Sequence, residues 1–401
     1  NAAEALGRLA DRNDANRIAI AQEGGIAPLV ALVRDGTDSQ KVKAAEALGR
    51  LADDNDANRI AIAEEGGIAP LVALVRDGKR RHKANAAEAL GRLADRNDAN
   101  RIAIAQEGGI APLVALVRDG TDSQKVKAAE ALGRLADDND ANRIAIAEEG
   151  GIAPLVALVR DGKRRHKANA AEALGRLADR NDANRIAIAQ EGGIAPLVAL
   201  VRDGTDSQKV KAAEALGRLA DDNDANRIAI AEEGGIAPLV ALVRDGKRRH
   251  KANAAEALGR LADRNDANRI AIAEEGGIAP LVALVRDGTD SQKDIAAKAL
   301  GRLADDNDAN RNEVCAQLVA VVRDGKRRHK ANAAEALGRL ADRNDANRIA
   351  IALEGGIAPL VALVRDGTDS QKEKAAEALG RLADGNDANR IAIAREELLR
   401  K

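Results

Sequence analysis

The chain has 401 residues, 45% of them hydrophobic and 32% charged, and its formal net charge is −1. This balance excludes a uniformly basic nucleic-acid binder, although local basic patches stay compatible with it. No apolar run approaches the roughly 18 residues of a membrane-spanning helix and no signal peptide opens the chain, so we expect a soluble intracellular protein, cytoplasmic or nuclear. Phe, Tyr, Trp and Met are absent, so the core must consist of Leu, Ile, Val and Ala.

One unit of 42 residues recurs along the sequence, and a fixed period of this size predicts a repeat architecture. Its copies start near residues 1, 43, 85, 127, 169, 211, 253, 295, 332 and 374, which makes about ten repeats with the last one incomplete. Two versions alternate, one ending in Thr-Asp-Ser-Gln-Lys and the other in Lys-Arg-Arg-His-Lys. The near identity of the copies is typical of natural duplication or of a consensus design.

Three helices are predicted in each repeat. A long helix begins at a capping box, in which Thr37 and Gln40 satisfy each other's backbone donors. A short helix over residues 57–65 follows and ends at a Gly-Gly pair. Another helix, over residues 68–77, has Pro70 in its first turn, where the missing N–H does no harm. We name them the third, first and second helix of a repeat, respectively.

The long helix has an apolar stripe that a single repeat cannot bury. Ala45, Leu48 and Ala52 fall on one such stripe at helical spacing. Neighbouring repeats must therefore stack to cover these residues. We expect an all-α fold in which residues 1–401 form one solenoid domain with three helices per repeat.

The repeat resembles the armadillo repeat along essentially the whole chain. The words that carry the resemblance are Gly-Gly-Ile-Ala-Pro-Leu-Val, within residues 58–75, and Ala-Ala-Glu-Ala-Leu-Gly-Arg-Leu-Ala at residues 44–52. HEAT repeats are the near alternative, but the Gly-Gly turn before a proline-started second helix favours armadillo. The resemblance implies a right-handed superhelix whose third helices line a concave groove for extended peptides. In that family a tryptophan and an asparagine, four residues apart, occupy the groove, and the asparagines hold the peptide backbone.

This chain carries a glutamate and an arginine where the family has tryptophan and asparagine. A Glu–Arg pair in this order stabilises a helix by about 0.2–0.5 kcal/mol. The pairs are interpreted either as a solvated face or as a charged groove for a partner with alternating charges, and Lys298 makes one repeat locally positive. The candidate groove residues are Glu46, Arg50, Glu88, Arg92, Glu130, Arg134, Glu172, Arg176, Glu214, Arg218, Glu256, Arg260, Lys298 and Arg302.

The four Lys-Arg-Arg-His-Lys segments, which we name the basic words, form a second candidate site. Cations oppose the partial positive charge at the start of a helix, and a local rule broken without compensation favours a function. The alternatives are an extended polyanion as ligand or a solvated charge run. We expect the histidines at the surface, with no metal. The residues are Lys79, Arg80, Arg81, His82, Lys83, Lys163, Arg164, Arg165, His166, Lys167, Lys247, Arg248, Arg249, His250, Lys251, Lys326, Arg327, Arg328, His329 and Lys330.

The repeat over residues 295–331 is irregular, because five residues are missing and the Gly-Gly-Ile-Ala-Pro word is replaced. We expect a kink or a change of superhelical pitch there. The only cysteine, Cys315, falls within it at an apolar position, so we expect a buried thiol.

Three functional hypotheses remain. The first is a non-enzymatic scaffold that binds a protein or peptide through the third helices or the basic edge. The second is a structural or designed module without a ligand, and the third is a polyanion binder. No catalytic residue, cofactor or metal is expected, because every Ser, His, Asp and Thr belongs to a repeated word. Ala2, Ala3 and Leu6 are expected to be exposed, which allows head-to-tail self-association.

Overall fold

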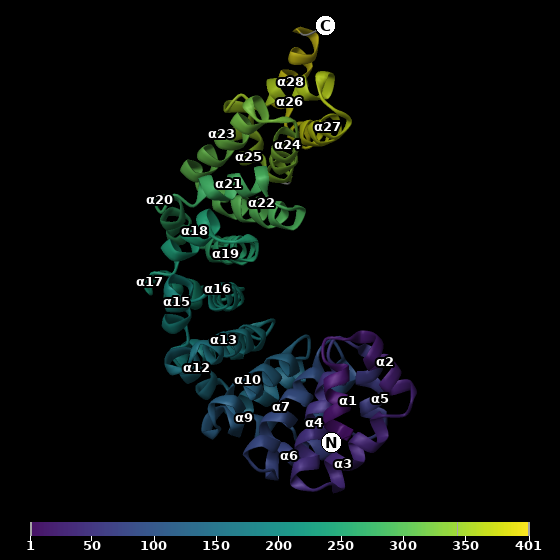
Figure 1. Ribbon diagram of the computed structural model, residues 1–401. Coiled ribbons are helices and arrows are strands. Elements are labelled where there is room, and N and C mark those ends of the chain that lie inside the picture. The colour runs from purple at the N-terminus through teal and green to yellow at the C-terminus, as the bar shows by residue number, and fades with distance from the viewer. Residues whose placement is uncertain (1, 343, 400–401) are drawn as a thin grey trace. The chain divides into compact units, whose positions relative to one another are not determined.

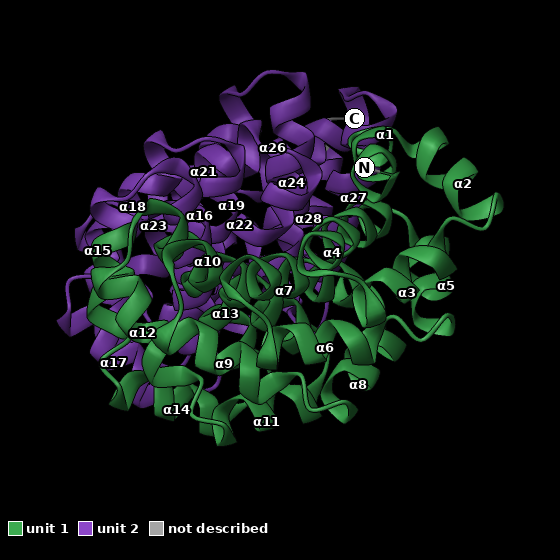
Figure 2. Ribbon diagram, turned by 60° about the horizontal axis from the view of Figure 1, so that its bottom comes forward, with its two compact units in different colours: residues 1–200 green, residues 201–401 purple. Residues whose placement is uncertain are grey.

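The computed structural model describes residues 2–342 and 344–399, which form 28 helices and no strand (Figure 1). The chain divides into two compact units, residues 1–200 and 201–401 (Figure 2). Each unit is a stack of repeats with a first, a second and a third helix. The all-α prediction and the prediction of three helices per repeat are therefore confirmed.

The helices fall into three classes with one exception. The first helices are α2 (Asp14–Gln22), α5 (Asp56–Glu64), α8 (Asp98–Gln106), α11 (Asp140–Glu148), α14 (Asp182–Gln190), α17 (Asp224–Glu232), α20 (Asp266–Glu274), α25 (Asp345–Leu353) and α28 (Asp387–Leu399). The second helices are α3 (Ile26–Asp35), α6 (Ile68–Asp77), α9 (Ile110–Asp119), α12 (Ile152–Asp161), α15 (Ile194–Asp203), α18 (Ile236–Asp245), α21 (Ile278–Asp287) and α26 (Ile357–Asp366). The third helices are α1 (Ala2–Ala10), α4 (Asp38–Ala52), α7 (Arg80–Ala94), α10 (Asp122–Ala136), α13 (Arg164–Ala178), α16 (Asp206–Ala220), α19 (Arg248–Ala262), α22 (Asp290–Ala304), α24 (Arg327–Ala341) and α27 (Asp369–Ala383). The exception is α23 (Asp308–Asp324).

Local sequence sets the helix ends. The side chain of Asn55 accepts a hydrogen bond from the Asn58 backbone and caps α5. Gly66 follows the other end of α5 and has φ +70°, a conformation that glycine adopts without strain. The predicted capping box of Thr37 and Gln40 is present at the start of α4. No single helix in the described residues is long and apolar enough to span a membrane, although α25 and α26 pass that test as a pair bent by 81°.

Small residues let the third helices pack closely within each unit. Ala44, Ala45 and Ala47 are fully buried in α4, which packs on α1 and α7. A Cβ built on Gly49 would lie 3.3 Å from the Cα of Ala89, so glycine is needed at this approach. Alanine and glycine are thus the residues that fit between third helices at this close spacing, where larger side chains would collide.

The first helices carry a buried polar ladder that the sequence analysis did not predict. The side-chain amide of Asn58 donates to the carbonyls of Leu51, at 3.0 Å, and of Arg17, at 3.2 Å. Arg59 is 2% exposed and donates from Nε to the Arg92 carbonyl at 3.1 Å. The Leu51 and Arg92 carbonyls lie at the ends of third helices and the Arg17 carbonyl lies in the preceding first helix, so these bonds tie successive repeats together.

The irregular repeat merges its first and second helices. Its helix α23 is a continuous run of 17 residues, because no Gly-Gly turn interrupts it. Helix α24 consequently packs against α21 of the repeat before, and its contact with α22 is small compared with other pairs of neighbouring third helices. A Cβ on Gly301 of α22 would meet only Leu340 Cδ2, at 3.8 Å. The side chain of Asn332 donates to the Arg286 carbonyl of α21, at 3.0 Å.

Cys315 lies in α23 and is fully buried, as predicted. Burial raises the pKa of its thiol to about 12, because a thiolate would lose its hydration there. We expect native protein to resist thiol reagents such as Ellman's reagent at neutral pH and protein in denaturant to react at once. Since only the unfolded chain can ionise at an ordinary thiol pKa of about 8.5, this residue should also reduce stability as the pH rises above that value. Fast labelling of native protein would contradict the burial.

The expected exposure at the start of the chain is wrong for Ala3, which is buried, and only partly right for Leu6, which is half-buried. Ala2 is exposed, and Leu9 is 54% exposed. Packing of α1 on α4 accounts for the burial, because Gly7 approaches Ala47 within Cβ contact distance.

Candidate functional site

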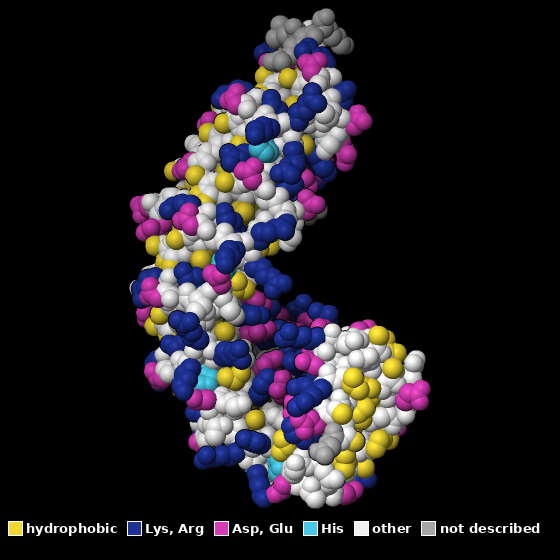
Figure 3. Space-filling model, in the orientation of Figure 1, with side chains coloured by type: hydrophobic (Ala, Val, Ile, Leu, Met, Phe, Trp, Pro, Cys, Tyr) yellow, Lys and Arg dark blue, Asp and Glu magenta, His cyan; other side chains and the backbone are white. Residues whose placement is uncertain are grey.

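The third helices present the predicted Glu–Arg pairs as formed ion pairs. Arg50 Nη2 lies 2.7 Å from Glu46 Oε1, and the same pair closes in α7, α10, α13, α16, α19, α24 and α27. We name the surface formed by these pairs the third-helix face; α22, which has Lys298 in place of the glutamate, has no such pair. Figure 3 shows basic and acidic side chains interspersed over the visible surface, which is consistent with such pairing.

Several arginines of the third-helix face also reach the preceding repeat. Arg50 and Arg134 donate from Nη1 to the carbonyls of Gly7 and Gly91, at 3.2 and 3.3 Å. In the third helices that begin with a basic word, the arginine pairs with an aspartate instead: Nη1 of Arg176 in α13 lies 2.9 Å from Asp137. The guanidinium side chains of α4, α7, α10 and α13 are between 20% and 33% exposed. These arginine side chains are therefore held in fixed orientations, with part of each guanidinium group exposed to solvent.

Lys298 does not make its repeat locally positive, which corrects the sequence-based expectation. Its ammonium group lies 2.9 Å from Asp294, one turn earlier in α22. Asp294 also pairs with Arg339 of α24. These two cations hold the pKa of Asp294 below its ordinary value, so the carboxylate stays charged and offsets Lys298.

The basic words are compensated within the fold, contrary to the expectation from sequence. Lys79 pairs with Asp38 of the preceding third helix, and this hydrogen bond holds the pKa of Asp38 below its ordinary value. Lys83 donates to the Arg76 carbonyl at 2.8 Å and so satisfies the negative end of α6. Among the described residues, Arg80 and Arg81 are the cations of this word whose side chains are exposed and form no hydrogen bond or ion pair. A word thus offers fewer free cations than its composition suggests.

The histidines of the first three basic words are buried, so the expectation of surface histidines is wrong. His82 is 4% exposed, and its Nδ1 accepts the Lys79 backbone N–H at 3.1 Å. Its Nε2 lies 3.0 Å from the Asp38 carbonyl, which requires the proton on Nε2. In the repeats that carry Thr-Asp-Ser-Gln-Lys instead of a basic word, glutamine takes the place of this histidine. The side chain of Gln124 accepts the Thr121 backbone N–H and donates to the Arg80 carbonyl at 3.0 Å. Histidine and glutamine at this position therefore make equivalent hydrogen bonds, one to the start of their own helix and one to the preceding third helix.

This equivalence predicts that His82→Gln leaves stability nearly unchanged. His82→Ala should reduce it by about 1–2 kcal/mol, because a helix cap and a hydrogen bond between repeats are both lost. Urea unfolding followed by circular dichroism measures both variants. Equal losses for glutamine and alanine would contradict the assignment.

Two further features escaped the sequence analysis. One isoleucine per first helix is half-exposed, including Ile60 at 47% and Ile102 at 42%. The buried Asn58 and Arg59 lie on the opposite stripe with Ile62, and that helical spacing was the available signal. Within residues 2–342 and 344–399, no three His, Cys, Asp or Glu side chains are grouped as metal ligands.

The comparisons place this geometry in a family. The family model for the armadillo/beta-catenin-like repeat matches residues 55–95, 139–179 and 223–263, each a first, second and third helix of the same version of the unit. The chain has the armadillo fold, and three of its repeats match the family model. A crystal structure of an engineered protein is 28% identical and superposes with a TM-score of 0.79, covering 96% of this chain and 95% of that one.

Two designed armadillo repeat proteins share the fold over part of the chain. They are 24% and 22% identical, with TM-scores of 0.56 and 0.55, and each comparison covers 59% of this chain and 99% of the other. The second of these was solved in complex with the peptide (KR)4. No curated protein sequence matches this chain. Its near-identical units give it the consensus character of a designed array.

Proposed function

We propose that this armadillo repeat protein is a non-enzymatic scaffold that binds an extended peptide with alternating acidic and basic side chains along the third-helix face. The observation that carries the proposal is the regular presentation of an oriented Glu–Arg pair on every third helix except α22, where Lys298 replaces the glutamate. Glutamate offers an acceptor for a basic side chain of the peptide, and the arginine fork suits a carboxylate.

The spacing of the helices supports a peptide with a two-residue period. Packed helices lie about 8–10 Å apart, and an extended chain advances about 3.3–3.6 Å per residue. Two residues thus cover about 7 Å and four cover about 14 Å, so two residues are the alternating step nearest to one helix spacing. The (KR)4 ligand of the designed relative also has a two-residue period. The asparagine row of the natural family is replaced here, so side-chain charge must supply the recognition.

Competition from the internal pairs makes each contact weak. An exposed ion pair contributes about 0.2–1 kcal/mol, and a ligand must replace one that already exists. Binding should therefore require several repeats at once, rise with peptide length and fall with added salt.

The test is fluorescence anisotropy with labelled glutamate–lysine peptides of two lengths, in which the residues alternate or stand in two blocks. The longer alternating peptide should bind best. The double variant Arg50→Ala with Arg134→Ala should weaken binding, and the matched control Arg34→Ala with Arg118→Ala should not. The control arginines end second helices, are exposed and also pair with an aspartate. Equal affinity for the two arrangements, or no binding, would overturn the proposal and favour a module without a ligand.

A further inference from the structure

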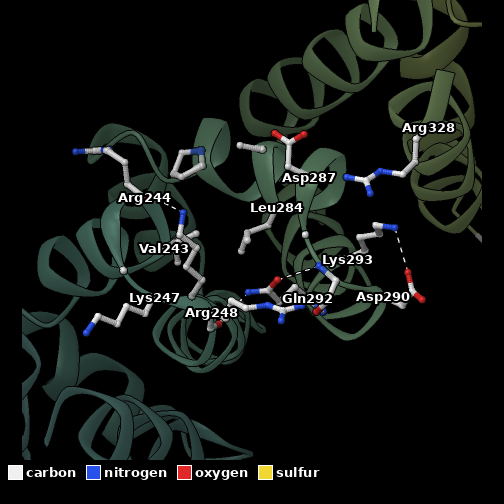
Figure 4. A pocket seen from close by; sticks show the side chains of 16 residues that line it. Val243, Arg244, Lys247, Arg248, Leu284, Asp287, Asp290, Gln292, Lys293 and Arg328 are labelled. Atoms are coloured by element: carbon white, nitrogen blue, oxygen red, sulfur yellow. Dashed lines mark hydrogen bonds and ion pairs between the residues drawn. The ribbon is translucent and has the colours of Figure 1, made fainter. Parts of the chain in front are cut away.

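A cleft of about 1020 Å³ lies in the second unit beside the irregular repeat (Figure 4). It is lined by α18, α19, α21 and α22, with Arg328 of α24 at one side. Its charged lining consists of six cations and two carboxylates, namely Arg244, Lys247, Arg248, Lys251, Lys293, Arg328, Asp287 and Asp290. The surplus of positive charge in this lining attracts anions.

Four of the six cations come from two different basic words, namely Lys247, Arg248 and Lys251 from one and Arg328 from the other, because the chain is shortened between the two words. In a regular repeat the histidine contacts the preceding third helix, as His250 does at the Asp206 carbonyl, 3.0 Å away. His329 lies instead 3.0 Å from Asp287, at the end of α21. This shift follows from the packing of α24 on α21 and brings Arg328 to the cleft, where Figure 4 shows it reaching toward Asp287.

Internal partners engage the carboxylates more completely than the arginines. Asp287 pairs with Arg286 at 2.7 Å as well as with His329, and Asp290 pairs with Lys293 at 3.1 Å. Arg244 and Arg248 have no side-chain hydrogen bond or ion pair in the described part of the chain. In other repeats the arginine equivalent to Arg244 pairs with the following aspartate, as in Arg160–Asp161 at 3.0 Å. Both guanidinium groups are thus available to a ligand.

We infer that this cleft binds an anion that carries two or more phosphate groups. Arginine guanidinium groups bind phosphate in a bidentate manner, and cations contributed by four separate helices suit several phosphates better than one. The apolar lining, which includes Val243, Pro280 and Leu284, would exclude water from part of the ligand. The site is independent of the third-helix face.

Calorimetric titration of the whole protein with inorganic tripolyphosphate tests the inference. Arg328→Ala should weaken binding about tenfold, the loss expected when a hydrogen bond between charged groups is removed. Arg81→Ala, the same position of a basic word next to regular repeats, removes the same charge and should leave the affinity unchanged. Equal weakening by both variants, or no binding, would overturn the inference and leave only a diffuse field of charge.

A second variant keeps every cation of the cleft and restores the regular repeat. Residues 312–317 are replaced with the sequence of residues 270–280, which returns the five missing residues. Tripolyphosphate affinity should fall to that of Arg328→Ala, and unchanged affinity would contradict the role of the shortening. A doubly phosphorylated peptide, titrated beside tripolyphosphate, identifies the source of the phosphates by which of the two binds more tightly.

Discussion

Replacing Asn142 by aspartate is expected to destabilise the first unit by at least about 3 kcal/mol at neutral pH. The Asn142 amide nitrogen donates to the carbonyls of Leu135, at 2.9 Å, and Arg101, at 3.3 Å, and the residue is 3% exposed. Aspartate has the same shape but would bring a buried carboxylate against two carbonyl oxygens. Protonation would restore one donor, so the loss should shrink as the pH falls toward about 4.

The matched control is Asn312→Asp, the same exchange at an exposed position of α23. It should change stability by no more than about 0.5 kcal/mol. Urea unfolding of both variants at several pH values gives the measurement. Losses of similar size at both positions would mean that the asparagine ladder does not join the repeats as described.

Gly91→Leu should reduce stability by about 2 kcal/mol or more. A Cβ at this position would lie 3.2 Å from the Cα and 3.3 Å from the Cβ of Ala131 on the neighbouring third helix. The obstacle is backbone, which cannot turn aside as a flexible side chain can. Inserting a small group into a packed core costs about 1–3 kcal/mol, and the larger leucine side chain should cost more. This cost should exceed the gain of about 1 kcal/mol that follows from the higher helix propensity of leucine.

Gly301→Leu is the corresponding change where α24 has moved away from α22. Only Leu340 Cδ2 lies near, at 3.8 Å, so the propensity gain should balance or outweigh the packing cost. Thermal unfolding compares the two variants. An equal loss in both would show that α22 and α24 pack as closely as a regular pair.

The helices could be predicted from sequence because their signals are local. Thr37 with Gln40, the Gly-Gly turn and Pro70 each determine an end of a helix without help from the rest of the fold. The 42-residue period then gave the stacking, since no helix can bury its apolar stripe alone.

The roles of polar residues could not be predicted, because they depend on partners about one repeat away. His82 reaches the Asp38 carbonyl, and Arg59 reaches the Arg92 carbonyl. In sequence both residues resemble solvated charges, and only the stacking geometry shows that each satisfies a buried carbonyl. The same limit explains why Lys298 was expected to leave a positive repeat, since its partner Asp294 was not recognised as an acceptor.

The irregular repeat shows a different limit. The five missing residues are visible in the sequence, and they led us to expect a kink or a change of superhelical pitch. The packing partner of α24 could not be predicted. Whether α24 packs against α22 or against α21 depends on the length of the merged helix α23. The cleft beside it follows from that choice.

Photo-cross-linking with a long alternating glutamate–lysine peptide tests the proposed binding surface most directly. A photoreactive residue at the centre of the peptide attaches it to its nearest neighbour, and mass spectrometry identifies the modified segment. We predict cross-links in third helices such as α7 and α10, near their Glu–Arg pairs. Cross-links confined to the half-exposed isoleucines of the first helices, or to the basic words, would contradict binding along the third-helix face.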